Sequence, residues 1–115
     1  MKPRTTKGIY LTNDVRYQLK EIKDKYHVTF KRLIPAILYQ VVSNDDSVIY
    51  TGMPVSSENK YLKNITISPD MYDRLKQMAN KRHMLFNDFL NSAIIATLTY
   101  CNVDSIVINH IHIID

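Results

Sequence analysis

The chain has one cysteine, Cys101, and no tryptophan. A single cysteine cannot form an intrachain disulfide, which suits a reducing compartment, and we therefore expect a cytoplasmic protein. No apolar run approaches the roughly 20 residues that span a bilayer. No apolar segment follows the basic and polar stretch at residues 1–7. The sequence thus predicts neither a membrane association nor a secretory signal.

The sequence also lacks the motifs that mark most enzymes. It has only two glycines and therefore no Gly-rich phosphate loop. It shows no spacing of metal ligands and no catalytic triad. His110 and His112 share one face of an expected strand, but two histidines are too few for a metal site. We expect no catalytic residues, no metal and no cofactor.

What is present is an ordinary globular composition. The chain has 115 residues, of which 45% are hydrophobic and 23% are charged, which is enough for one compact domain with a modest core. The net charge is +4 and the isoelectric point is about 9.2. This balance favours a polyanionic partner such as nucleic acid.

An internal repeat organises the chain. When the sequence is shifted by 56 positions, a gapless match runs from about Lys7/Lys63 to Val42/Leu98. Identical residues recur at Ile9/Ile65, Asp14/Asp70, Leu19/Leu75, Lys20/Lys76, Lys25/Lys81, His27/His83 and Phe30/Phe86. The match predicts a first repeat over residues 1–50 and a second over 61–115, with a linker at 51–60. Similar segments at 46–49 and 104–107 predict an extra short strand after each repeat.

Each repeat begins with a pattern typical of a short strand. Apolar Ile9 and Leu11 alternate with their neighbours in the first repeat, and Ile65 and Ile67 do so in the second. A period of two with β-branched residues indicates a half-buried strand. A lone strand cannot satisfy its main chain, so we expect the two strands to pair antiparallel within one chain.

Each strand is followed by two expected helices. Thr12 and Ser68 stand at N-cap positions, where a hydroxyl accepts from free main-chain N–H groups. His27 and His83 lie at the break between the helices, where a structural role is expected. Pro35 should bend the second helix or remove one of its hydrogen bonds. The predicted class is α+β, mainly α, with two β-α-α repeats paired as an intramolecular pseudo-dimer.

This arrangement would turn the apolar residues of both strands onto the helices and expose the residues between them. The exposed set is Gly8, Tyr10, Asn64 and Thr66. A two-stranded ribbon fits the major groove of double-stranded DNA, and an asparagine such as Asn64 can bond an adenine edge at two points. The ribbon therefore favours sequence-specific DNA binding.

The strand, the capped helix and the hairpin into Val28–Phe30 or Met84–Phe86 resemble the ribbon-helix-helix family of the Arc and MetJ repressors. Two copies in one chain resemble the TraY arrangement of conjugative plasmids. The resemblance implies base reading by the four exposed ribbon residues, in a plasmid or phage-type relaxosome accessory protein or a transcriptional repressor. It also implies phosphate binding at the start of each second helix, by Thr29, Phe30, Lys31, Arg32, Leu85, Phe86 and Asn87.

Two features leave other partners open. Residues 105–115 form an almost continuous strand pattern that must pair, either with residues 47–50 or with a second copy of the chain. A relaxase or another protein is also a possible partner. The rival class is a protein-binding module, such as an antitoxin or an assembly factor, which grips its partner with the strands and helices.

Overall fold

The computed structural model describes residues 5–43 and 60–100. The fold is α+β and mainly helical, with four helices and one two-stranded antiparallel sheet in this part of the chain. The order strand, helix, helix occurs twice. The elements are β1 (Thr5–Thr12), α1 (Asn13–Tyr26), α2 (Phe30–Ser43), β2 (Lys60–Ile67), α3 (Pro69–Lys81) and α4 (Phe86–Tyr100).

The helix that follows each strand begins at the same kind of cap. The Thr12 hydroxyl accepts a hydrogen bond from the Val15 N–H at 3.3 Å. The Ser68 hydroxyl accepts from the Met71 N–H at 3.2 Å, and Pro69 occupies the first turn of α3. A proline there costs little, because the first N–H groups of a helix have no partner within the helix. Both N-caps predicted from the sequence are confirmed.

Both helical hairpins turn at a histidine. His27 and His83 each have φ 55°, and they are the non-glycine residues with positive φ among those the structure describes. The His27 N–H donates to the Lys23 carbonyl, and the His83 N–H donates to the Asn80 carbonyl at 3.0 Å. The main chain of each histidine thus ends the first helix in the left-handed conformation that closes many helices.

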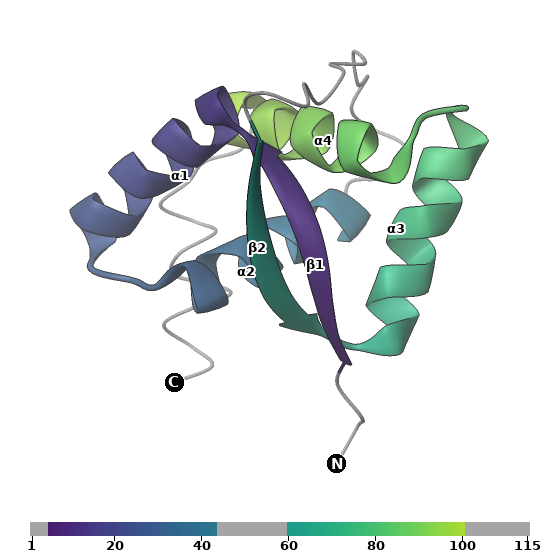
Figure 1. Cartoon of the computed structure of the whole chain (residues 1–115), viewed down its shortest axis with the longest axis horizontal. Coiled ribbons are helices and arrows are strands. Elements are labelled where there is room, and N and C mark those ends of the chain that lie inside the picture. The colour runs from purple at the N-terminus through teal and green to yellow at the C-terminus, as the bar shows by residue number, and fades with distance from the viewer. Residues whose placement is uncertain (1–4, 44–59, 101–115) are drawn as a thin grey trace.

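The two strands pair with each other, as expected. Gly8 lies opposite Asn64, and the neighbouring pairs are Lys7 with Ile65 and Ile9 with Lys63. Gly8 and Asn64 are also equivalent positions of the 56-residue match. Equivalent residues of the two strands therefore lie at equal distances along the ribbon on either side of this central pair. Figure 1 shows the strands in front, with α1 and α3 on opposite sides of them.

The inner face of the sheet carries the predicted core residues. Ile9, Leu11, Ile65 and Ile67 are all buried. They pack on helices whose apolar stripes meet behind the strands, with Leu33, Ile34 and Ile37 from α2 and Phe89, Leu90 and Ile94 from α4 among the buried side chains. The helical contacts fix which face of the ribbon is turned outward, because successive strand residues point to opposite faces.

Some sequence predictions meet the structure only in part. β2 begins at Lys60, one residue inside the stretch predicted as a linker at 51–60. The rest of that linker, and the extra strands predicted near 46–49 and within 105–115, lie outside the described residues. Pro35 lies inside α2. None of the described helices combines the length and the apolarity needed to cross a bilayer.

The left-handed histidines generate a stability prediction. Replacing either His27 or His83 with glycine should raise the free energy of unfolding by about 0.5–1 kcal/mol, because glycine adopts positive φ without the steric cost of a Cβ. Urea titrations of the single variants measure the change. Lys20→Gly, at an exposed position in the middle of α1, is the control and should lower the free energy of unfolding by about 1 kcal/mol. A loss of stability in both histidine variants would show that their side chains stabilise the turns.

Candidate nucleic-acid interface

The outward face of the ribbon presents six residues between the strand ends. They are Thr6, Gly8 and Tyr10 from β1 and Leu62, Asn64 and Thr66 from β2. They alternate with the inner residues, and all are exposed or half-buried. Four of the six were predicted. Thr6 and Leu62 were missed because both strands extend further than the apolar alternation indicated.

The two ends of this face differ in chemistry. At one end Thr6 lies opposite Thr66, and their hydroxyls hydrogen-bond each other at 3.3 Å. At the other end Tyr10 lies opposite Leu62, whose side chain is 57% exposed. We call these the threonine end (Thr6 and Thr66) and the tyrosine end (Tyr10 and Leu62). Gly8 and Asn64 form the centre between them.

Leu62 extends from the tyrosine end towards the centre. A Cβ placed on Gly8 would lie 3.1 Å from Leu62 Cδ1 and 3.5 Å from Asn64 Oδ1. The end of the leucine side chain therefore has to shift slightly before a Cβ fits at position 8. An exposed aliphatic group thus joins a face for which the sequence predicted only Gly8, Tyr10, Asn64 and Thr66.

Cations rest on aromatic rings at both flanks of the ribbon. Lys63 Nζ lies 4.8 Å from the centre of the Phe30 ring, and Lys7 Nζ lies 4.8 Å from that of Tyr72. The Tyr72 ring meets Phe86 edge to face, with 5.2 Å between ring centres. Phe30 and Phe86, both expected at the phosphate contacts, are thus half-buried rings: Phe30 packs under Lys63, and Phe86 packs on the Tyr72 ring that Lys7 covers.

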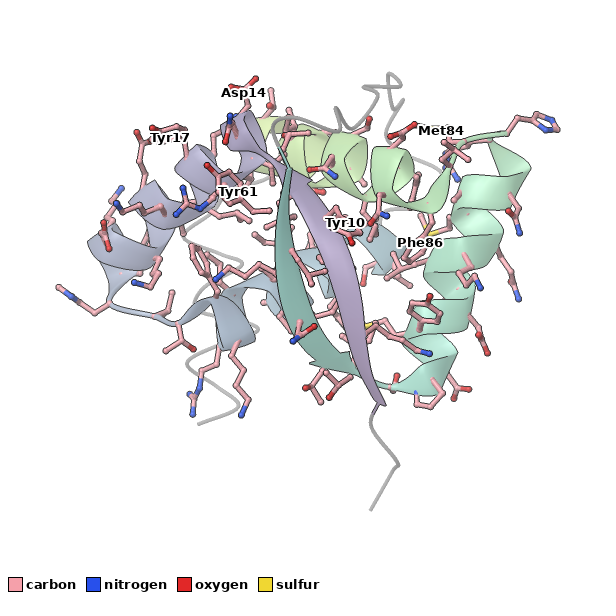
Figure 2. All side chains as sticks on the ribbon, in the orientation of Figure 1. Tyr10, Asp14, Tyr17, Tyr61, Met84 and Phe86 are labelled. Atoms are coloured by element: carbon pink, nitrogen blue, oxygen red, sulfur yellow. The ribbon has the colours of Figure 1, made fainter. Side chains whose placement is uncertain are left out.

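A third cation–aromatic contact lies at the start of α1. The Arg16 guanidinium carbon lies 4.2 Å from the centre of the Tyr61 ring. Figure 2 shows Tyr61 beside β2 on the side of α1, whereas Tyr10 lies beside β1 on the side of α4. The ribbon is therefore bordered by positive charge held on aromatic surfaces.

The starts of α2 and α4 differ although they are equivalent in the repeat. The first turn of α2 carries exposed Lys31 and Arg32 and no acidic residue. The first turn of α4 carries Asp88, and it is preceded by Leu85, which is 76% exposed. Because a helix N-terminus and adjacent cations both attract anions, the start of α2 suits a phosphate better than the start of α4.

Thr29 and Asn87 complete the set expected to bind phosphate. Thr29 is exposed, and its main-chain carbonyl accepts from the N–H groups of Arg32 and Leu33. Asn87 is half-buried, and its Oδ1 accepts from the Tyr10 N–H at 3.1 Å. The side-chain oxygen of Asn87 is therefore engaged with β1.

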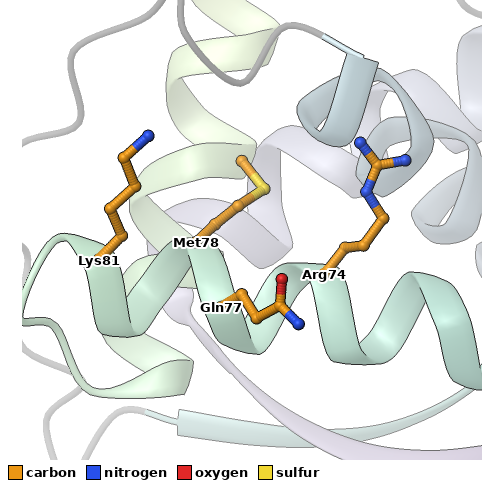
Figure 3. Close-up of a pocket in the computed structure, with 4 residues that line it drawn as sticks. All are labelled: Arg74, Gln77, Met78 and Lys81. Carbon is orange, nitrogen blue, oxygen red and sulfur yellow. The ribbon is translucent and has the colours of Figure 1, made fainter.

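A separate hollow of about 290 Å³ lies on α3, lined by Arg74, Gln77, Met78 and Lys81. Figure 3 shows these side chains side by side on the helix. At 100° per residue, Arg74 and Lys81 lie on the opposite side of α3 from Tyr72, which meets β1 through Lys7. The hollow is therefore turned away from the ribbon. In residues 5–43 and 60–100, no three metal-ligating side chains gather.

Comparisons with protein-family models, with curated proteins and with solved structures find no match for this chain. The interpretation of the ribbon therefore rests on its own geometry and chemistry.

The contact over Gly8 generates a second stability prediction. Gly8→Ala should raise the free energy of unfolding by about 0.4–1 kcal/mol, because alanine restricts the unfolded chain and the exposed Leu62 can rotate away. Thermal and urea unfolding measure the change. Gly8→Ala/Leu62→Ala is the control that removes the contact itself. If Gly8→Ala is destabilised and the double variant recovers, Leu62 is held over the centre of the ribbon.

Proposed function

We propose that the chain is a tandem ribbon-helix-helix protein that binds double-stranded DNA by placing the outward face of its ribbon in the major groove. The supporting observation is the pairing of Gly8 with Asn64. These residues occupy equivalent positions of the two repeats, so the pair lies where the axis of a pseudo-dimer would pass. The repeated caps and the repeated left-handed histidines agree with this arrangement.

The side chains on this face suit base edges. Asn64, at the centre, has the donor and the acceptor that an adenine edge requires. Hydroxyls such as those of Thr6 and Thr66 can bond several base types, and an apolar group such as Leu62 can contact a thymine methyl. Tyr10 adds a hydroxyl and a ring. Base edges and methyl groups in the groove thus offer partners to both ends of the ribbon.

The site read by one molecule is asymmetric in this proposal. A homodimeric ribbon presents the same side chains at both ends and therefore reads a palindrome. Here one end is threonine with threonine and the other is tyrosine with leucine. We place one half of the DNA site at each end and the base pair read by Asn64 between them.

Backbone contacts are asymmetric as well. We assign the principal phosphate anchor to the start of α2, where Lys31 and Arg32 supplement the helix dipole. The start of α4 contributes less, because Asp88 repels a phosphate. The net charge of +4 supplies a general attraction to the polyanion.

The biological role follows from the resemblance alone. A cytoplasmic relaxosome accessory protein and a transcriptional repressor both bind DNA in this way, and the tandem layout favours the accessory role by analogy. A relaxase or a second copy of the chain would be a further partner.

A protein-binding module is the second candidate, and the exposed Leu62 at the tyrosine end favours it. Leu62 and Tyr10 together give an aromatic and aliphatic contact surface of a kind enriched in protein interfaces. DNA binding through this face falls steeply as salt rises, because counterions are released from the phosphates. A complex formed by burying Leu62 against a protein depends less on salt.

The anchor at α2 generates a prediction about salt. Lys31→Ala/Arg32→Ala should weaken binding to all duplexes and flatten the log–log salt dependence by roughly 0.9 per lost phosphate contact. Fluorescence titrations at several salt concentrations measure the slope. Arg74→Ala/Lys81→Ala removes one arginine and one lysine from the side of α3 turned away from the ribbon (Figure 3) and should leave the slope nearly unchanged. Equal slopes for both double variants would contradict the assigned anchor.

The ribbon face generates a prediction about sequence. Selection from a pool of randomised duplexes should enrich a site without two-fold symmetry. On single-base substitutions of that site, Asn64→Ala should lose about 1–3 kcal/mol of discrimination at a central base pair. Thr66→Val and Leu62→Ala should lower discrimination between bases in opposite halves of the site. A palindromic consensus, or variants that weaken all sequences equally, would show that this face does not read bases.

A further inference from the structure

The outer edge of β1 is bonded to two asparagines of α4, Asn87 and Asn91, which we call the asparagine pair. Asn91 is fully buried at 0% exposure. Its Nδ2 donates to the Tyr10 carbonyl at 2.8 Å and to the Asn87 carbonyl at 2.8 Å. Its Oδ1 accepts from the Thr12 N–H at 2.9 Å. With the bond from the Tyr10 N–H to Asn87, three main-chain groups of β1 are satisfied by α4.

These hydrogen bonds allow the side chain of Asn91 to be buried. A buried amide is costly unless its donors and its acceptor find partners, and here both Nδ2 hydrogens and the oxygen are used. Removing the amide would leave the Tyr10 carbonyl and the Thr12 N–H without these partners. The pair therefore fixes the distance between the start of α4 and the tyrosine end of the ribbon.

The equivalent edge of β2 cannot be held in the same way. The residues of α2 that correspond to Asn87 and Asn91 are Lys31 and Pro35. A lysine ammonium has no acceptor, and the proline ring has no polar atom. Neither side chain can accept a hydrogen bond from the N–H groups of Thr66 and Ser68, the residues of β2 and of the α3 cap that correspond to Tyr10 and Thr12. The same backbone plan thus has different chemistry at its two edges.

We propose that Asn91, together with Asn87, is a positioning residue for base recognition. It acts through the main chain of Tyr10 and presents the tyrosine end in one fixed arrangement. The threonine end lacks this attachment and adapts to the DNA. Preorganised groups discriminate more sharply than mobile ones, so the tyrosine end supplies the stricter half of the site. This inference rests on the proposed function, because it requires that the ribbon reads bases.

Amide hydrogen exchange of the free protein tests the attachment without DNA. Asn91→Ser is the main variant, because a serine hydroxyl can bond the Asn87 carbonyl one turn back but cannot reach β1. Asn91→Ala is the more severe variant. The Thr12 amide should exchange about tenfold faster in both, as expected for the loss of one hydrogen bond. The amides of Ile9 and Leu11 point towards β2 and serve as internal references.

Thr97→Val, which removes a buried hydroxyl of α4 six residues beyond Asn91, is the matched control and should leave the Thr12 amide unchanged. Equal acceleration at Ile9, Leu11 and Thr12 in Asn91→Ser would mean general loosening and would overturn the proposal. An unchanged exchange rate of the Thr12 amide in Asn91→Ser would overturn the proposal as well.

Binding to the duplex selected by the wild-type protein tests the effect on recognition. Asn91→Ser should lower discrimination about tenfold at base pairs under the tyrosine end, while the threonine end and binding to unrelated DNA stay unchanged. Tyr10→Ala should lower discrimination at the same base pairs. Asn91→Ser/Tyr10→Ala should lose no more than Tyr10→Ala alone, because the first residue acts through the second.

Additive losses, or an equal loss at both ends, would overturn the positioning role. If the wild-type protein enriches no duplex, the proposed function fails and the role in recognition fails with it. The exchange experiment then still decides whether the asparagine pair holds the edge of β1.

Discussion

The sheet has two strands in residues 5–43 and 60–100, and the hydrogen bonding of its main chain is the constraint on which this structure depends. Each of these strands has one neighbour in the described part of the chain, so each has an outer edge whose N–H and C=O groups need another element or water. The pairing of β1 with β2, centred on Gly8 and Asn64, satisfies the edges that face each other and sets which side chains face the helices. The outer edge of β1 is met by Asn87 and Asn91. The bonds that complete the sheet therefore also place α4 beside the surface that we assign to DNA.

The two halves share a backbone plan but not its side chains. Equivalent positions hold Lys31 and Asn87, Arg32 and Asp88, and Pro35 and Asn91. In a symmetric homodimer one residue must serve in both places, because the same surface occurs twice. A tandem chain is free of that requirement. In the complex we propose, one half specialises in anchoring phosphate and the other in holding the ribbon.

Much of the fold could be predicted from the sequence. The strands, the caps at Thr12 and Ser68 and the buried isoleucines follow from patterns within a few residues, and the structure confirms them. Leu62 was missed because Lys60–Lys63 shows no apolar alternation that would reveal an outward position. The asparagine pair was missed because its partners lie on a distant strand. A signal was present, since the two asparagines stand four residues apart, on one face of a mainly apolar helix.

The sequence by itself determined the local elements, the repeat and the inward side of each strand, because helical and strand periods are properties of short segments. Only the tertiary structure decided the register that sets Tyr10 against Leu62 and Thr6 against Thr66. It also decided that Asn91 bonds Tyr10, across 81 positions of the chain. Such contacts depend on how the four helices pack against the strands. No pattern within a short segment encodes a contact between residues so far apart in the chain.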